Sequence, residues 1–277
     1  MNQTIEQFIQ AMNEAGIQSP GEIIADSSLH RFTIPGDKSR SDNGWYILHA
    51  DDPAAGAFGC WKRQINETWS CKPYQTMTTT DKTAYTAKME AVRRARESER
   101  ELKQAECRKW CDATWEKAKD AINSHPYLKS KGVNSYGLKT FKDNLLIPVQ
   151  DTSGTIHGMQ FISPDGTKKF KTGTNKTGHF YGIGEAKGNT ICIAEGYATA
   201  ASVHQATEYP VLAAFDAGNL KPVAEAVHAQ YPQLKIIICA DNDQWTPGNP
   251  GLTKATEAAR AVSGLLAIPT FKGVYHE

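Results

Sequence analysis

Residues 190–241 read TICIAEGYATAASVHQATEYPVLAAFDAGNLKPVAEAVHAQYPQLKIIICAD, and this stretch decides the fold. Short apolar runs, typical of buried strands, alternate with segments in which apolar residues recur at helical spacing. The expected strands cover residues 190–195, 209–215 and 234–241, and the expected helices cover residues 196–207, 220–231 and 251–266. Alternation at this spacing favours an α/β fold, in which crossover helices join the strands of a parallel sheet.

Acidic residues stand where two of these strands end. Glu195 ends the first strand, and Asp241 and Asp243 end the third. Ligands of open parallel sheets bind beyond the carboxyl ends of the strands, and carboxylates gathered there repel one another unless a cation relieves the repulsion. Side chains two positions apart in an extended segment point the same way. The sequence therefore predicts a Mg²⁺ site at Asp241 and Asp243, with Mn²⁺ as the alternative ion.

Glu195 has two candidate roles at this site, as a further metal ligand or as a general acid/base. The structural alternative is simpler, because an Asp after a strand is often the N-cap of the next helix. The combination of strand-Glu-Gly with a later strand-Asp-x-Asp favours the metal site.

A basic loop region precedes this part of the chain. Residues 144–151 and 155–163 read as two strands joined by a turn at 151–154. Residues 164–182 then place lysines among glycines and aromatic residues, which suits a phosphate-facing loop as well as it suits an ordinary solvated loop. The lysines are Lys168, Lys169, Lys171 and Lys176.

The N-terminal part of the chain shows a different sequence pattern. Residues 4–15 read as an amphipathic helix, and residues 30–72 read as a small antiparallel β unit. Its aromatic residues are Trp45, Tyr46, Phe58, Trp61 and Trp69, and the nearby basic residues are Arg31, Lys38, Arg40, Lys62 and Arg63. The aromatic residues fit a hydrophobic core, and the alternative is a face on which single-stranded bases stack. We expect a core for most of them.

Residues 81–120 are dominated by Ala, Glu, Lys and Arg, which predicts a long helix that acts as a solvated connector. A DNA-contacting role for Arg93, Arg94 and Arg96 is the alternative.

The composition allows a globular protein of one or two domains, since 40% of the 277 residues are hydrophobic. Lys plus Arg number 31 against 30 for Asp plus Glu, so affinity for nucleic acid must come from local patches. No apolar stretch predicts a membrane span or a signal peptide, and we expect no membrane partner and a cytoplasmic location. Cys192 and Cys239 are expected to be free thiols in buried strands. A zinc site at Cys60, Cys71, Cys107 and Cys111 is a less favoured alternative, because these residues form no close Cys-x-x-Cys pair.

Three segments together carry a family resemblance: IAEGYATAAS (193–202), IIICADND (236–243) and NPGLTKATEAA (249–259). They resemble the Toprim domain, and YPVLAAFDAGNL (209–220) is similar to that domain in primases of conjugative plasmids, phages and satellite phages. Upstream, HPYLKSKGV (125–133) and KFKTGTNKTGHFYGIGEA (169–186) resemble the basic subdomain of bacterial-type primases. The resemblance covers about residues 121–271.

The resemblance implies an organisation of the chain in four segments. These are a small β-rich N-terminal unit that is a candidate for DNA binding (1–75), a charged helical linker (76–120), a basic α+β primase subdomain (121–186) and a Toprim domain with a Rossmann-like parallel sheet and flanking helices (187–277).

The resemblance also implies roles for single residues. Glu195 corresponds to the catalytic acid/base, and Asp241 and Asp243 correspond to metal ligands. Lysines of the basic subdomain hold nucleotide and template, with Lys169 and Lys176 as the nearest matches. Asp216 and Asn219 are secondary candidates, because they occupy a loop that faces the site.

This chain departs from the pattern of cellular primases at three points. Thr199 stands where those primases often carry an acid, four residues after the glutamate. No further acidic pair follows the last strand, so we expect the chain to be part of a longer protein. The zinc ribbon of cellular primases is absent, which leaves residues 30–72 as a candidate for template selection.

The resemblance implies a DNA primase of a mobile element that uses Mg²⁺ to join ribonucleoside triphosphates on a single-stranded DNA template. A replicative helicase, in the same chain or separate, is a further candidate partner. Two alternatives remain open: a Toprim nuclease with the same metal site, and an inactive replication adaptor that binds single-stranded DNA.

Overall fold

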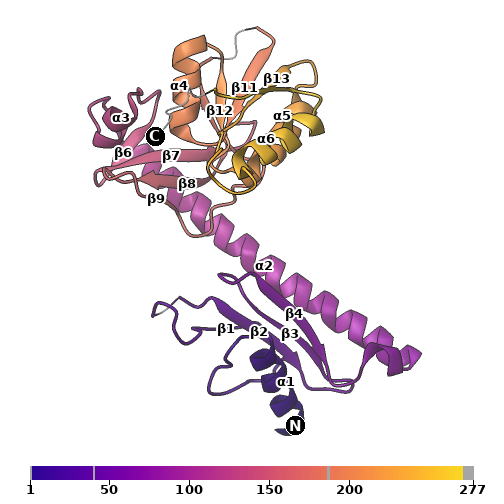
Figure 1. Cartoon of the computed structure of the whole chain (residues 1–277). Coiled ribbons are helices and arrows are strands. Elements are labelled where there is room, and N and C mark those ends of the chain that lie inside the picture. Colours follow the sequence, from indigo (N-terminus) through magenta and orange to yellow (C-terminus); the bar gives the residue numbers. More distant parts are fainter. Residues whose placement is uncertain (1, 40, 186–187, 271–277) are drawn as a thin grey trace, which may run out of the picture. The chain divides into compact units, whose positions relative to one another are not determined.

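The parallel sheet expected from the sequence is present in the computed structural model, which describes residues 2–39, 41–185 and 188–270 (Figure 1). Its strand order is β10-β12-β11-β13-β14, and every neighbouring pair is parallel except β10 with β12. The strands are β10 (Tyr181–Ile183), β11 (Thr190–Ala194), β12 (Val211–Ala213), β13 (Lys235–Cys239) and β14 (Leu265–Ala267). The helices are α4 (Tyr197–Thr207), the short 3₁₀ helix η2 (Ala217–Asn219), α5 (Leu220–Gln230) and α6 (Pro250–Ala261). The expected α/β fold is confirmed, but the helix expected at residues 251–266 ends at Ala261, and Leu265–Ala267 form strand β14 of the sheet instead.

The sheet is covered on both faces because its strands are apolar on both sides. Cys192 and Ala194 of β11 pack with α4, whereas Ile191 and Ile193 pack with α5 and α6. This alternation follows from the opposite directions of successive side chains in a strand. Burial on both faces explains why the strands read as continuous apolar runs.

An antiparallel sheet precedes the parallel one, in the order β5-β6-β7-β8-β9. Its strands are β5 (Lys119–Asp120), β6 (Lys139–Phe141), β7 (Asn144–Gln150), β8 (Ile156–Ile162) and β9 (Lys168–Phe170), and helix α3 (Pro126–Lys131) lies between β5 and β6 in the chain. The predicted hairpin is β7 with β8. Leu145, Ile147 and Val149 of β7 share one core with α4. One core therefore fixes this sheet against the parallel sheet.

The chain divides into two units, residues 1–101 and 102–277. The first contains helix α1 and a four-stranded antiparallel sheet, as expected from residues 30–72. Its elements are α1 (Asn2–Glu14), β1 (His30–Phe32), β2 (Gly44–His49), β3 (Ala55–Cys60), β4 (Ile65–Ser70) and the 3₁₀ helix η1 (Tyr74–Thr76). The division into four segments stays a prediction.

Most aromatic residues of the N-terminal unit lie in its core. Tyr46 and Phe58 are buried with Phe8 of α1, and Trp45 is buried on the opposite face of the sheet. Trp69 is partly buried against the α1 side, whereas Trp61 is 43% exposed. The core interpretation therefore holds for most of these residues but not for Trp61. Arg40 lies outside the described residues.

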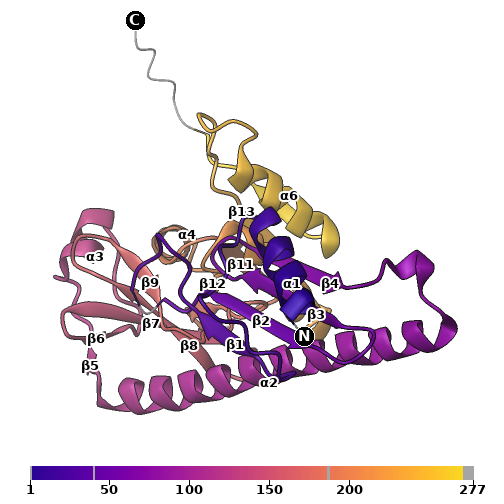
Figure 2. The same cartoon turned by 90° about the horizontal axis from the view of Figure 1, so that it is seen from below.

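The long helix α2 spans Thr79–Lys117 (Figure 2). Thr78 and Asp81 cap its start reciprocally: the Asp81 N–H donates to Thr78 Oγ1, and the Thr78 N–H donates to Asp81 Oδ2, both at 3.2 Å. Within the first unit Val92 is buried beneath Trp45, and within the second unit Cys107 and Cys111 are buried beside β7 and β8. The helix therefore also packs against the core of each unit, in addition to the connecting role that its charge pattern predicts. All six cysteines are free thiols.

Candidate metal and nucleotide site

The strand register brings the predicted acidic residues to one edge of the parallel sheet. β11 and β13 are adjacent and parallel, and Ala194 lies opposite Cys239. Glu195 follows β11, and Asp241 and Asp243 follow β13 after Ala240. The chain thus directs the acids toward the same edge, as the sequence predicts.

The electrostatics show that these carboxylates are close enough to affect one another. Burial raises the pKa of Glu195, and repulsion from Asp241 and Asp243 raises it further. Burial also raises the pKa of Asp241, although a hydrogen bond of 3.3 Å from Thr199 Oγ1 to Asp241 Oδ1 opposes the shift. Two half-buried carboxyl groups whose pKa values are raised by burial and by neighbouring carboxylates form a site that favours a positive ligand. Because every candidate donor is a carboxylate oxygen, the site suits a divalent, hard cation.

Asp243 has a structural contact as well. It is exposed, and its Oδ2 accepts a hydrogen bond of 3.3 Å from the N–H of Gly251 in the first turn of α6. A Cβ added at Gly251 would lie 2.8 Å from Asp243 Oδ2 and 2.5 Å from the Asp241 carbonyl oxygen. Only glycine permits this close approach, so the start of α6 holds the loop of the two aspartates. The N-cap of α6 is Asn249, whose Oδ1 accepts from the Leu252 N–H at 3.3 Å, so neither aspartate is the cap that the structural alternative expected. The contact of Asp243 with Gly251 is compatible with a metal role.

Two of the four predicted lysines, Lys168 and Lys176, lie near the acidic residues. Lys168 lowers the pKa of both Glu195 and Asp241, and a Cβ added at Gly196 would lie 3.7 Å from Lys168 Nζ. Lys176 forms an ion pair with Asp216, the residue that caps η2. Asp216 also contributes to the raised pKa of Glu195. Lys168, Lys176 and Asp216 therefore belong to the surroundings of the acidic site.

The other two lysines, Lys169 and Lys171, lie on the face of the antiparallel sheet that packs against α2, opposite to Lys168. Lys169 is opposite Phe161 in the register of β8 and β9, and Phe161 packs on the core beside α2. Lys171 Nζ lies 4.9 Å from the ring centroid of Trp110, a residue of α2. Alternation along β9 separates Lys168 from Lys169, which the sequence placed in one basic group.

Asn219 acts as a clamp behind the site. Its side chain is 3% exposed, and its Nδ2 donates to the carbonyl oxygens of Lys176 at 2.7 Å, Ala214 at 2.8 Å and His179 at 3.0 Å. Its Oδ1 accepts from the Gly178 N–H at 2.8 Å. Asn219 therefore holds the basic loop 176–179 against the parallel sheet.

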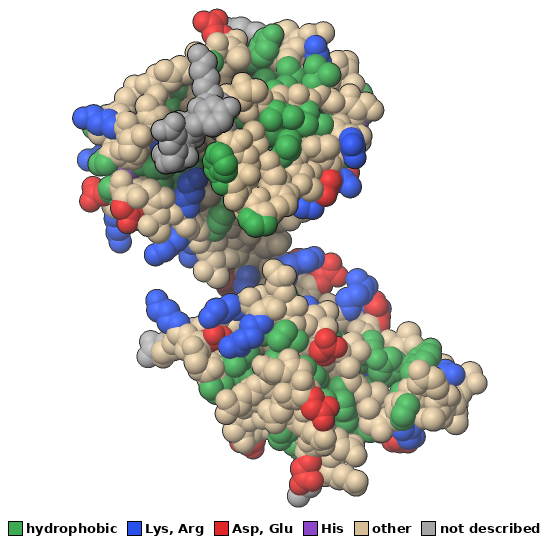
Figure 3. Space-filling view, viewed as in Figure 1, with side chains coloured by type: hydrophobic (Ala, Val, Ile, Leu, Met, Phe, Trp, Pro, Cys, Tyr) green, Lys and Arg blue, Asp and Glu red, His purple; other side chains and the backbone are tan. Residues whose placement is uncertain are grey.

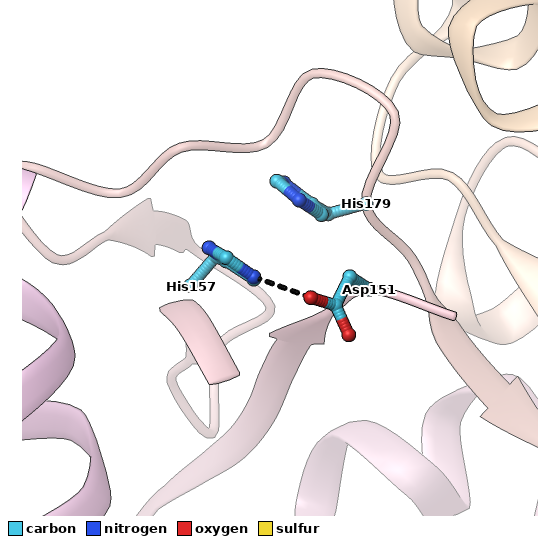
Figure 4. Close-up of side chains that lie close together, drawn as sticks. All are labelled: Asp151, His157 and His179. Carbon is cyan, nitrogen blue, oxygen red and sulfur yellow. Dashed lines mark hydrogen bonds and ion pairs between the residues drawn. The ribbon is translucent and has the colours of Figure 1, made fainter. Parts of the chain in front are cut away.

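Sequence reasoning did not find a second polar cluster, formed by Asp151, His157 and His179 (Figure 4). His157 Nε2 lies 2.8 Å from Asp151 Oδ2, and the two imidazole rings stack with centroids 4.0 Å apart at 8° between planes. Within the described ranges it is the only set of three His, Cys, Asp or Glu residues whose ligand atoms all lie within 4.8 Å of one another. Glu195, Asp241 and Asp243 are therefore not that close as a set.

The histidine cluster is arranged for hydrogen bonding more than for ligation. His179 Nδ1 donates to the Asn175 carbonyl oxygen at 2.8 Å, and because the rings are parallel, their lone pairs do not converge on one ion. Burial opposes ionisation of Asp151, but hydrogen bonds from Ser153, His157 and Thr155 lower its pKa well below the usual value. No sequence motif could have found this cluster, because its members come from a strand end, a strand and a distant loop.

Comparison with known proteins finds a family model and two relatives that are similar to this chain. A model of the Toprim domain matches residues 189–268. Two curated proteins from Escherichia coli, both named DNA primase TraC, are each 34% identical to this chain over 96% of its length. The chain spans 26% of the length of the first relative and 19% of the second.

A structural comparison finds the DnaG primase catalytic domain bound to ssDNA. It is 12% identical, the match covers 61% of this chain and 71% of that chain, and the TM-score is 0.42. At this TM-score the likeness carries no weight for fold or function.

No helix in the described part of the chain is long and apolar enough to cross a membrane. The predicted resemblance is confirmed by the match at residues 189–268 and by the sequence identity along the chain. Residues 189–268 therefore match the Toprim domain, and the chain as a whole is similar to part of DNA primase TraC.

Proposed function

We propose that the chain is the catalytic part of a DNA primase, which joins ribonucleoside triphosphates on a single-stranded DNA template. The main support is the coincidence of a Toprim carboxylate edge, facing Lys168, with 34% identity to DNA primase TraC over 96% of the chain. A mobile-element context, a cytoplasmic location and a replicative helicase as partner belong to the same proposal.

Glu195, Asp241 and Asp243 would hold Mg²⁺, or Mn²⁺ in its place. The ion would supply positive charge for the triphosphate and for the charge that develops during phosphoryl transfer. The mutual repulsion of these carboxylates supports this assignment, because a cation would remove it.

Glu195 has a second role in the proposal, as the general base for the attacking 3′-hydroxyl. A raised pKa brings a carboxyl group closer to the operating pH, where general acid/base catalysis is most efficient. Its position beside Lys168 suits this role, since the lysine can hold a phosphate next to the reacting hydroxyl.

The lysines would bind phosphates. Lys168 and Lys176 are nearest to the carboxylates, so we assign them to the nucleotide. Lys169 and Lys171 lie on the other face of β9 and would contact the backbone of the template or product. Asp216 and Asn219 position Lys176 and its loop.

The decisive experiment is synthesis of oligoribonucleotides on a single-stranded DNA template with four ribonucleotides and Mg²⁺. We expect template-dependent products from the parent chain and a loss of about 10²-fold or more for Glu195→Gln and Asp241→Ala. The control is Glu225→Gln, which alters an exposed carboxylate on α5 that pairs only weakly with Lys221 at 3.7 Å.

Two other results would contradict the proposal. Shortening of the DNA in the absence of ribonucleotides would indicate a nuclease. DNA binding without any Mg²⁺-dependent product would indicate an adaptor.

A further inference from the structure

The N-terminal unit exposes one large aromatic side chain among arginines. Trp61 follows β3 and is 43% exposed, although Trp45 next to it is buried. The Arg31 guanidinium lies 5.3 Å from the Trp61 ring centroid, and the Arg96 guanidinium lies 5.2 Å from it. An exposed indole ring flanked by cations presents a flat face for stacking and a positive charge beside it.

Arg96 carries a charge that the protein does not neutralise. Its guanidinium packs 4.1 Å from the Trp45 ring centroid and donates to Asn66 Oδ1 at 2.7 Å, a neutral partner. Among the described residues it forms no ion pair, and its Nε is buried without a hydrogen-bond partner. Burial, with repulsion from Arg31 and Arg100, lowers its pKa below the usual value. An anion beside Arg96 would relieve this repulsion.

The side chains around Trp61 enclose a small hollow. Its volume is about 250 Å³, and it is lined by Trp61, Arg93, Arg96, Glu97 and Arg100. Pockets for drug-sized ligands are roughly 300–1,000 Å³, so this one suits a single nucleotide unit.

Positive charge dominates the rim of the hollow. Arg31 is paired with Glu99, Arg93 is paired with Glu90 at 2.7 Å, and Glu97 is shared between Arg93 and Arg100. Arg31, Arg93, Arg96 and Arg100 therefore face three glutamates. Figure 3 shows Lys and Arg side chains gathered on the surface of this unit. The rim therefore offers phosphate-binding groups next to the stacking face.

We propose that this hollow, defined by Trp61, Arg93, Arg96 and Arg100, is a binding site for single-stranded DNA. A base stacks on the Trp61 ring, and the flanking phosphates contact Arg93 and Arg100. Single strands are held in this way by other proteins, because each base has a face for stacking and each linkage has a negative charge. A duplex does not fit, because its base faces are covered by neighbouring pairs.

The site would supply the proposed primase with its template, so its biological meaning rests on that function. Its physical basis does not, because binding of single-stranded DNA can be measured on the full chain without any reaction. An acidic segment of a partner protein would also have the right charge. Unlike DNA, however, such a segment would offer no base to stack on the exposed Trp61 ring.

The test measures fluorescence anisotropy of a labelled single-stranded oligonucleotide with the full chain and its variants. Trp61→Ala should weaken the Kd by about 5- to 100-fold, the range that follows from the loss of one stacked base. Trp61→Phe should recover part of the affinity, because the smaller ring still stacks. Tyr74→Ala is the matched control, since Tyr74 is 52% exposed in the same unit and lies near a single cation, Lys82.

The charge contribution has its own matched pair on α2. Arg100 lines the hollow and pairs with Glu97 at 3.3 Å, whereas Arg94 lies outside it and pairs with Glu90 at 3.2 Å. Arg100→Ala should lower the slope of log Kd against log salt by about 0.7, as expected for one lost phosphate contact on a single strand. Arg94→Ala should leave the slope unchanged.

Equal affinity of the parent chain and Trp61→Ala, or equal affinity of the parent for single strand and duplex, would overturn the proposal. Primer synthesis is measured separately on the same proteins. If Trp61→Ala loses binding and the parent chain makes no primers, this binding site is supported and the proposed function is contradicted. Primer synthesis with unchanged binding in Trp61→Ala would overturn this site and leave the proposed function intact.

Discussion

The side chain of Asn219 holds the main chain of Lys176, with 2.7 Å between Asn219 Nδ2 and the Lys176 carbonyl oxygen. Three further hydrogen bonds join the same amide to Gly178, His179 and Ala214. This buried amide therefore connects the basic loop to the sheet that carries the carboxylates.

We expect Asn219→Ala to lower the free energy of unfolding by about 3 kcal/mol, because buried backbone groups lose their partners. It should also raise the KM for ribonucleotides, since Lys176 is no longer held in place. Urea unfolding and steady-state kinetics provide the measurements. Asn144→Ala, which removes one exposed hydrogen bond, should cost less than about 1 kcal/mol. Equal unfolding free energies for the two variants would show that Asn219 is not a clamp.

The raised pKa values of Glu195 and Asp241 predict an unusual effect on stability. A carboxyl group whose pKa is higher in the folded state contributes stability below its unfolded pKa and loses it as pH rises through the folded pKa. At neutral pH, with EDTA present, the ionised site therefore destabilises the fold. Glu195→Gln should raise the Tm under these conditions and reduce the rise in Tm that Mg²⁺ causes in the parent. Scanning calorimetry checks both, and an identical Mg²⁺ response in parent and variant would exclude Glu195 from the metal site.

The same shifts predict how Mg²⁺ binding depends on pH. Protons compete with the cation for the carboxylates, so the rise in Tm caused by Mg²⁺ should be larger at about pH 8 than at about pH 5. The measurement is a pair of Mg²⁺ titrations followed by thermal unfolding. A response that does not change with pH would place the ion at groups other than Glu195 and Asp241.

The separation of the lysines predicts unequal effects in kinetics. Lys168→Ala should raise the KM for ribonucleotides by about 10- to 100-fold, the value of a lost hydrogen bond to a charged group. Lys169→Ala, one position along β9, should leave this KM nearly unchanged and weaken DNA binding, most strongly at low salt. Initial rates at varied ribonucleotide concentration distinguish the two. The reverse pattern would mean that Lys169, as the sequence resemblance implies, and not Lys168 binds the nucleotide.

The Asp151 carboxylate predicts an acid-dependent stability. Its pKa is lowered in the folded state, so its contribution is present above the unfolded pKa and is lost as pH falls through the folded pKa. Asp151→Asn should therefore be less stable than the parent at neutral pH, and the difference should shrink below about pH 4. Urea unfolding at several pH values measures this. The variant should keep the parent's Mg²⁺ response, and loss of that response would make the histidine cluster part of the metal site.

The sequence alone determined the parallel sheet and the place of its acids. Short β-branched apolar runs such as residues 236–239, which alternate with longer helical segments, predict strands covered on both faces, and an acid directly after such a strand emerges at its carboxyl end. Both inferences depend on local periodicity, which neighbouring residues in the chain fix.

Only the tertiary structure showed on which face, at what depth and beside which partner each of these side chains lies. The register of β8 and β9 assigned Lys168 and Lys169 to different faces, and packing left Trp61 exposed while it buried Trp45. The contact between Asp151, His157 and His179 joins segments separated along the chain. Such pairings depend on which surfaces meet when the sheets and helices pack, and no single segment carries that information.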